Sequence, residues 1–519
     1  MFTDNRAIVS EMQERLKREN YTGEFSISEG KIHGSLHLNG KESFLKLYAG
    51  FFSRDLKEIK GNVDFSLHQD EDFNTKKVSL LGVFIRSECE DSSTINFRYA
   101  IIGGDKHITQ DEKIITEVRF LLDDSAFFKN DFASNKTFGR ARIYPLTEQD
   151  KVNFEEMVNR SFKENYPERP QRKINFGKYL DVVYFSGANE IVSIETEWGT
   201  VSVCHDVSYN LSMSQGKFNS VGIENHPFIS LKFKEGLVFE DAMDRYRKLK
   251  TFIEFVIGRP TNTISLRIGT KEGKYSQVYD VLQEYDYSKE MSAPNPMEMP
   301  VHPVISPQEF SHVLKRWSET DEKRGEARDL FARIFRDNHG LEEIPKRFGS
   351  VFEHLPEELK GDRDEGFIEL REKTRKEWEE FEPKSSNSKK DRSSILSALA
   401  RTEPLTLRSI VHHRAEVIMD QIGDKLPELK MVTDRAIDCR IFYEHGPSSR
   451  KINFDKDLGV VWFLGDTLKF VFLASEFIDC GWDITKYSGS RSGHTHPMSL
   501  FLFSYEHLLN DLKTFLKQF

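Results

Sequence analysis

The chain has 519 residues, of which 38% are hydrophobic and 30% are charged, and its formal net charge at pH 7 is -10. A chain of this length predicts two or three domains with cores of ordinary size. The acidic balance excludes a general nucleic-acid coat protein, which carries a basic excess, so any contact with a nucleic acid must be local.

Three features of the sequence indicate where in the cell the protein is expected: the cysteines, the N-terminus and the longest apolar run. Four cysteines lie without C-x-x-C spacing, which predicts neither a disulfide framework nor a zinc site and favours a reducing cytoplasm. They are Cys89, Cys204, Cys439 and Cys480. The first 20 residues mix acidic and basic side chains without an apolar centre, so no signal peptide is expected. Charged residues interrupt the run from Gly459 to Trp482, which predicts a buried bundle helix and no membrane span.

Strand patterns dominate the chain up to about residue 235. Apolar and polar residues alternate from His33 to Leu38, for example, and Gly, Asn and Asp stand at the breaks. We predict two β-rich domains, residues 1–166 and 167–291. The second domain includes a helix from Phe239 to Ile257, closed by Gly258, which we expect to pack on the second sheet.

A proline-rich segment marks the change from strands to helices. Residues 292–304 contain four prolines and are predicted to be a linker. The helical region, residues 305–519, opens with a predicted capping box at Ser306–Glu309. A polar, mobile loop is expected from Lys384 to Ser394. The core of the region, about residues 395–519, is predicted to be a helical bundle, so the fold class is α+β. Its predicted helices are Leu405–Met419, Lys430–His445, Leu458–Cys480 and Ser499–Phe519.

One of these helices ends with an arginine and a histidine separated by four residues, Arg440 and His445, directly before Gly446. Arginine is always charged and its fork of donors suits a phosphate, while histidine titrates near neutral pH and can take or give a proton. Together they suit phosphodiester cleavage without a metal. Five residues turn a straight helix by about 140°, so the two side chains would not share one face. We expect the last turn to loosen and a second subunit to complete the site.

Neighbouring polar side chains are candidates for supporting roles. Asp438 and Glu444 can orient the arginine or the histidine by hydrogen bonding, or they can be ordinary solvated residues of a helix face. His412 and His413 on the preceding helix can face the same cleft, with Arg414 as a further phosphate contact. The alternative for these three residues is one packed side chain and two solvated ones.

The sequence assigns no cofactor and no metal. His494 and His496 resemble half of a metal site, but no cysteine or acidic cluster accompanies them. The chain also lacks the G-x-x-x-x-G-K-[ST] loop that cradles nucleotide phosphates.

Two features resemble known families. The spacing of Arg440 and His445, late in a C-terminal helical region, resembles the signature of the HEPN ribonucleases. The segment EFSISEGKIHGSLHL, followed by FLKLY and IKGNVDF, resembles the N-terminal domain of the ApeA anti-phage proteins, which carry a HEPN domain behind it. That family usually has a polar residue directly after the arginine, where this chain has Ile441.

The resemblance implies an RNA endonuclease that acts in anti-phage defence. In the implied mechanism the ribose 2′-hydroxyl attacks the adjacent phosphate, His445 gives acid-base help, Arg440 stabilises the phosphoryl charge, and a 2′,3′-cyclic phosphate remains. The resemblance also implies a homodimer joined through the bundle and an RNA substrate such as tRNA. The N-terminal half would sense a phage-derived component or restrain the nuclease. The alternative is a non-catalytic HEPN-like dimerisation or binding protein with a ligand-binding β-sandwich.

Overall fold

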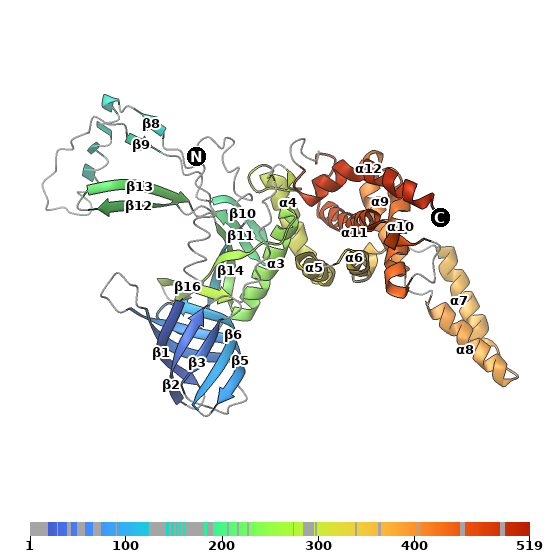
Figure 1. Ribbon diagram of the computed structural model, residues 1–519, viewed down its shortest axis with the longest axis horizontal. Helices are drawn as coiled ribbons and strands as arrows, with labels where there is room; N and C mark the ends of the chain where they lie inside the picture. The colour runs from blue at the N-terminus through green and yellow to red at the C-terminus, as the bar shows by residue number, and fades with distance from the viewer. Residues whose placement is uncertain are drawn as a thin grey trace.

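The computed structural model has strands in its N-terminal half and helices in its C-terminal half (Figure 1), which confirms the predicted fold class. The residues it describes are 19–27, 30–38, 43–48, 58–65, 74–89, 91–123, 142–144, 147–149, 152–153, 155–156, 159–160, 181–183, 190–204, 207–214, 217–225, 228–272, 275–283, 295, 298–337, 340–361, 365–401, 405–446, 452–487 and 494–519.

The first six strands close into a barrel. They are β1 (Glu19–Ile27), β2 (Gly30–Leu38), β3 (Phe44–Leu47), β4 (Glu58–Phe65), β5 (Asn74–Cys89) and β6 (Ser92–Gly103). Their order is β6-β3-β2-β1-β4-β5, and β5 pairs with β6 to close the ring. Phe25 is fully buried inside, and a Cβ at Gly61 would lie 2.4 Å from its Cδ1 atom, so only glycine leaves room for the ring. The first β-rich unit is therefore a closed barrel, and not the ligand-binding β-sandwich of the alternative hypothesis.

A second, open sheet continues from β6. Its order from β6 outward is β16-β15-β7-β14-β11-β10. The strands are β7 (Ile115–Leu122), β10 (Glu190–Thr196), β11 (Gly199–Cys204), β14 (Phe228–Leu237), β15 (Thr263–Glu272) and β16 (Tyr275–Gln283). Helix α3 (Phe239–Ile257) packs on β7 and β14, and Gly258 ends it with a φ of 80°, as the sequence predicts. Two separate two-stranded sheets pair β8 (Arg142–Tyr144) with β9 (Asp181–Val183) and β12 (Val207–Ser214) with β13 (Lys217–Asn225).

The sheet does not divide at residue 166, where two domains were expected. Strand β7 precedes that boundary in the chain, yet it pairs on one side with β14 and on the other with β15. The structural units are instead the barrel and the open sheet with α3, because strand pairing joins segments that are distant in sequence.

The open sheet with α3 and the helical half share one hydrophobic core, while the interior of the barrel forms a second core. Phe252 and Phe255 of α3 contact Trp317 of α4 (Pro307–Glu319), with ring centroids 5.4 and 5.8 Å apart. The buried carboxylate of Glu254 pairs with Arg336 of α5 (Asp321–Arg336) at 2.6 Å. The two halves are therefore packed together.

The predicted linker is part of this junction. Residues 298–303 are buried, and the Glu298 carboxylate accepts hydrogen bonds from the backbone N–H groups of Thr495 and His496 at 2.6 and 2.8 Å. Helix α4 begins at Pro307 as expected, but the predicted capping box does not form. Ser306 Oγ instead accepts a hydrogen bond from the backbone N–H of His302 at 3.1 Å.

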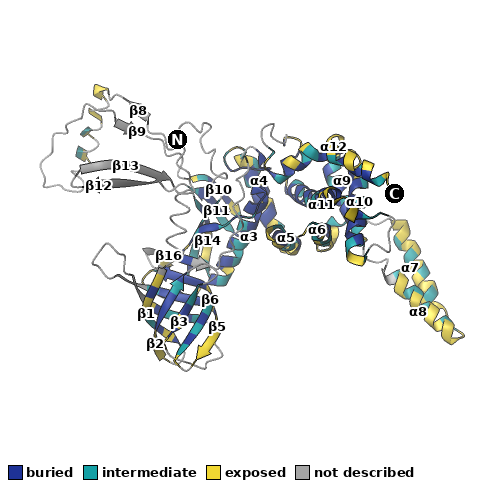
Figure 2. Ribbon diagram, in the orientation of Figure 1, coloured by how far each residue is buried: buried dark blue, intermediate teal, exposed yellow. Residues whose placement is uncertain are grey.

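The helical half is built around one buried helix, α11 (Leu458–Asp479), which is mostly dark blue in Figure 2. It packs against α6 (Glu343–Glu353), α9 (Leu407–Ile422), α10 (Leu429–His445) and α12 (Pro497–Leu516). Within the described part of the chain, α11 is the helix long and apolar enough to cross a membrane. However, 72% of its most apolar window is buried in the protein, as a bundle helix requires. Short 3-10 turns lie at Glu357–Leu359, Gly423–Lys425 and Phe454–Lys456.

Helices α9 to α12 are the four helices predicted for the end of the chain, each within a few residues of its expected bounds. The prediction of a loop from Lys384 to Ser394 is wrong, because α8 (Ser386–Arg401) begins at Ser386 and forms a hairpin with α7 (Glu365–Glu380). The sequence also does not predict α6, since Pro345 and Gly349 weaken its helix signal.

Candidate functional site

Helix α10 carries Arg440 and His445 at its C-terminal end. The helix is regular to His445, and the N–H of Gly446 donates to the carbonyl of Phe442 at 2.9 Å. The expected loosening of the last turn is therefore not found, because bonding from residue i to i−4 continues to the end. Gly446 has a φ of 82°, which glycine adopts at low cost, and it stops the helix.

Two carboxylates hold the largely buried side chain of Arg440. Its Nη1 donates to Glu353 Oε1 at 3.0 Å and its Nη2 donates to Glu353 Oε2 at 3.3 Å, while its Nε donates to Glu444 Oε1 at 3.0 Å. Arg440 is 8% exposed. Burial opposes the charged form, but the bonds to Glu353 and Glu444 outweigh it and raise the pKa of the Arg440 guanidinium. The result is a fixed cation whose fork faces α6.

Gly349 lets Arg440 lie this close to α6. A Cβ at position 349 would lie 2.7 Å from Arg440 Cδ, so a larger residue would push the guanidinium away from Glu353. Glycine inside a helix costs about 1 kcal/mol relative to alanine, and the close approach of Arg440 accounts for its use here. Sequence reasoning missed Glu353, and the helical glycine one turn before it is the signal that could have indicated this contact.

His445 lies at the open end of the helix. It is exposed, and the preceding residue, Glu444, is the supporting candidate that contacts Arg440. Because α10 stays straight, about 140° of helical rotation separates Arg440 from His445, and one chain does not present both on one face. Ile441, directly after the arginine, packs against the hydrophobic core.

Asp438 and His412 belong to an ion-pair cluster between α9 and α10. Asp438 accepts hydrogen bonds from Arg408 at 3.0 Å and from Arg435 at 2.7 Å. Asp434 pairs with Arg408 and lies 2.8 Å from Nε2 of His412. This cluster holds α9 against α10 through Arg408 and His412, whereas Arg440 donates to Glu353 and Glu444.

Arg414 lies inside the bundle instead of at a cleft. Its Nε donates to Ser475 Oγ at 3.1 Å and its Nη2 donates to Asp479 Oδ2 at 2.6 Å, which ties α9 to α11. The third candidate on α9, His413, lies 3.9 Å from Glu416 on the same helix. The structure thus gathers Arg440, Glu444 and Glu353, and leaves the candidates on α9 in other contacts.

His496 caps α12. It is fully buried, its Nδ1 accepts a hydrogen bond from the N–H of Met498 at 3.2 Å, and its Nε2 lies 3.1 Å from the carbonyl of Val256. Burial lowers the pKa of His496 to about 3. Across the described residues, no group of three His, Cys, Asp or Glu side chains is placed to hold a metal ion.

Comparison with known families bears on the N-terminal half. Residues 20–317 match the family model of ApeA N-terminal domain 1. The chain belongs to the ApeA family. ApeA proteins form an anti-phage defence family, so this protein is assigned to that broad class. The match covers the barrel, the open sheet, α3, the predicted linker and most of α4, and the core that α4 shares with the open sheet and α3 agrees with this extent.

No curated protein and no solved structure matches the chain. The ApeA match ends at residue 317, ahead of Glu353, Arg440 and His445. The function of the helical half of this ApeA-family protein therefore rests on its own geometry.

Proposed function

We propose that this ApeA-family protein is a metal-independent RNA endonuclease of the HEPN type, with Arg440 and His445 in its active site. The observation that supports this best is the fixed guanidinium of Arg440, which lies just over one turn before the exposed histidine that ends α10. The side chain is already held at the end of α10, so an RNA phosphate that replaces the Glu353 carboxylate would meet a positioned cation that stabilises its developing negative charge.

In the proposed reaction, the ribose 2′-oxygen forms a bond to the adjacent phosphorus and the bond from phosphorus to the 5′-oxygen breaks. His445 accepts the proton of the 2′-hydroxyl, and a second histidine protonates the leaving 5′-oxygen. Such acid-base help contributes on the order of 10²–10⁴-fold. Arg440 stabilises charge on the non-bridging oxygens, an effect on the order of 10²–10³-fold in comparable sites. The products are a 2′,3′-cyclic phosphate and a free 5′-hydroxyl.

The second histidine would come from another copy of the chain, so the proposal includes a homodimer. Leu458 and Trp462 lie one turn apart at the start of α11, the helix that follows α10 in the bundle, and both are exposed apolar side chains. Leu500 and Phe503 are likewise exposed on α12. We propose that a partner copy covers these side chains and brings its own α10 end to the site.

The proposal is tested by mapping RNA ends in cells that express the protein. New ends are expected with the wild-type chain and are expected to be absent with His445→Ala. The control is His507→Ala on α12, which removes a histidine whose side chain is 81% exposed. Cleavage ends that persist at the wild-type level with His445→Ala would refute the assignment.

A non-catalytic helical bundle is the second candidate. The observation that favours it is that Glu353 and Glu444 of this chain neutralise Arg440, as in a structural ion pair, while the partly buried Ile441 packs against the core. Growth on overexpression separates the two candidates. A nuclease slows growth, and His445→Ala relieves the effect. Equal growth with both chains favours the binding protein.

The N-terminal half is proposed to sense a phage-derived component and to bias the nuclease between inactive and active arrangements. Such a trigger must bind the two arrangements with different affinity. Expressing the helical half alone is a poor test of this role, because Trp317 packs against α3 and would be exposed without it. Sequencing phages that escape protection by the full chain is the better test. Escape changes that cluster in one phage gene, whose product binds the full chain, are expected.

A further inference from the structure

The hairpin of α7 and α8 projects from the helical half (Figure 1). None of the described residues of α7 is buried, and Figure 2 shows both helices mostly exposed or intermediate. Side-chain hydrogen bonds nevertheless hold the two helices of the hairpin together near its turn. Arg392 Nε donates to the carbonyl of Trp378 at 2.8 Å, and Arg392 Nη2 donates to the carbonyl of Glu379 at 2.5 Å. A braced hairpin that adds nothing to the core is available for binding.

The two helices of the hairpin differ in how their positive charges are balanced. On α7, Lys373 and Lys376 each have a glutamate four residues before and four residues after. On α8, neither Lys389 nor Lys390 has a carboxylate three or four residues away on either side. Residues at these spacings are neighbours on a helix surface, so α8 keeps an unbalanced positive field that α7 lacks. This is a local exception in a chain of net charge -10.

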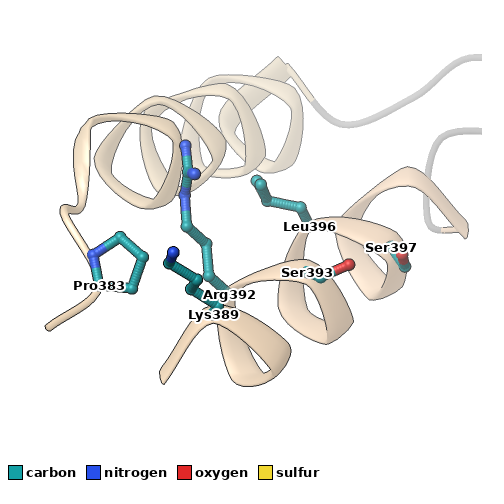
Figure 3. Close-up of a pocket in the computed structure, with 6 residues that line it drawn as sticks. All are labelled: Pro383, Lys389, Arg392, Ser393, Leu396 and Ser397. Carbon is teal, nitrogen blue, oxygen red and sulfur yellow. The ribbon is translucent and has the colours of Figure 1, made fainter. Parts of the chain in front are cut away.

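An open pocket of about 610 Å³ lies along this basic side of α8 (Figure 3). Its lining residues are Pro383, Lys389, Arg392, Ser393, Leu396 and Ser397. Those on α8 recur at helical spacing, so one face presents the Lys389 ammonium and two hydroxyls over about 12 Å of helix. The Arg392 guanidinium adds positive charge there, although its Nε and Nη2 already donate to the carbonyls of Trp378 and Glu379. Donors of this kind bind phosphate oxygens.

An aromatic platform stands at the turn beside the pocket. Phe381 is 44% exposed and packs edge-on against Trp378 with ring centroids 5.5 Å apart. A positively charged groove next to an exposed aromatic ring is the combination that binds single-stranded nucleic acid, where bases stack and the backbone is neutralised.

We propose that the α7–α8 hairpin binds the phosphate backbone of single-stranded RNA, with Lys389 as a direct phosphate contact and Phe381 as a stacking surface. This inference rests on the proposed function, because it gives the substrate a second hold beside the cleavage site. The hairpin is inserted between α6, which carries Glu353, and α9, which packs on α10. RNA bound to the hairpin is therefore tethered to the elements that hold Arg440.

The test measures RNA binding separately from cleavage. The full chain carrying His445→Ala is titrated into a fluorescently labelled 20-nucleotide oligouridylate at several KCl concentrations, with fluorescence anisotropy as the readout. Lys389→Ala is expected to weaken binding at least roughly threefold. It should also reduce the slope of log K against log salt by about 0.7, the value for one lost contact to a single strand. The matched control, Lys373→Ala on α7, should leave both within error, and Lys389→Arg should restore them.

Three outcomes would overturn the inference. In one, Lys389→Ala binds RNA with the affinity and salt slope of its parent. In another, Lys373→Ala weakens binding as much as Lys389→Ala. In the last, the oligouridylate does not bind, and a labelled oligoglutamate peptide binds in a Lys389-dependent way, which would assign the hairpin to an acidic protein partner. Cleavage by the chain with an intact His445 is scored separately, so failure of the hairpin site and failure of the proposed nuclease are distinguishable.

Discussion

Glu353 binds both terminal nitrogens of Arg440, at 3.0 and 3.3 Å, although 87 residues separate them in the chain. This pairing occupies the forked edge of the guanidinium, which is the edge that suits a phosphate. In the proposed reaction, an RNA phosphate has to replace the Glu353 carboxylate. In this structure the Arg440 cation is in position, but Glu353 occupies the edge that would bind the phosphate.

Glu353→Gln is expected to raise the rate of RNA cleavage by roughly threefold to tenfold, because it removes a negative charge that competes with the phosphate for Arg440. This change corresponds to a lowering of the activation free energy by about 0.7–1.4 kcal/mol. Initial cleavage rates of a labelled RNA measure the effect. Glu444→Gln is the matched control, since it removes an equal charge from Nε but leaves the Glu353 contact. Slower cleavage with Glu353→Gln would mean that this carboxylate positions the arginine instead of competing with substrate.

Arg440→Ala and His445→Ala are each expected to reduce cleavage by about 10²-fold or more. Their effects on stability should differ. His445 is exposed, so its loss should leave the melting temperature unchanged. Arg440 is buried between two partly exposed carboxylates, so its removal should cost about 1 kcal/mol. Arg440→Lys keeps the charge and loses the fork, and it should be inactive but nearly as stable. Wild-type cleavage by either alanine variant contradicts the site.

The buried histidine at the start of α12 should make stability depend on pH. Burial lowers the pKa of His496 to about 3, so the folded chain binds fewer protons at this residue than the unfolded chain, whose histidine titrates near 6.5. Stability contributed here is present above about pH 6.5 and is lost as the pH falls toward 3. The folded state should lose about 2 kcal/mol between pH 7 and pH 5 from this group.

Urea unfolding at the two pH values measures this loss. His496→Asn, which keeps a side-chain acceptor for the N–H of Met498, should flatten the dependence. His507→Asn on the exposed face of α12 should not change it. An equal pH dependence in both variants would show that another group is responsible.

Cleavage is expected to persist in excess EDTA and to leave 2′,3′-cyclic phosphate ends. In the proposed chemistry, Arg440 supplies the positive charge that a metal ion supplies in other nucleases. Chemical mapping of the 3′ ends checks the products directly. Products with 5′-phosphate ends that disappear on chelation would rule out attack by the 2′-hydroxyl.

The full chain should be a homodimer, with a mass near twice 60.4 kDa by light scattering. Phe503→Glu on α12, where the phenylalanine is 68% exposed, should shift it toward monomer and reduce cleavage together. Phe84→Glu, which alters an exposed apolar residue on β5 outside the bundle and the hairpin, is the matched control. A fully active monomer would refute a site completed by a second copy.

Local signals predicted much of the fold. Gly258 and Gly446 end α3 and α10 at the expected residues, since both take a positive φ that stops a helix. The change from strands to helices was likewise predicted correctly from alternation and helical spacing. The first half of α8 is polar and gives no apolar helical pattern. Its pairing with α7 holds it in place, and Arg392 of α8 donates to carbonyls in the last turn of α7.

The sequence by itself determined which residue types stand at the end of α10, where that helix stops, and that strands precede helices. Only the tertiary structure decided that β7 lies between β14 and β15, that residues 298–303 are buried, and that Glu353 reaches Arg440. The reason is the range of the forces involved. Capping and periodicity act within a few residues, whereas strand pairing and a buried ion pair depend on packing that brings distant segments together.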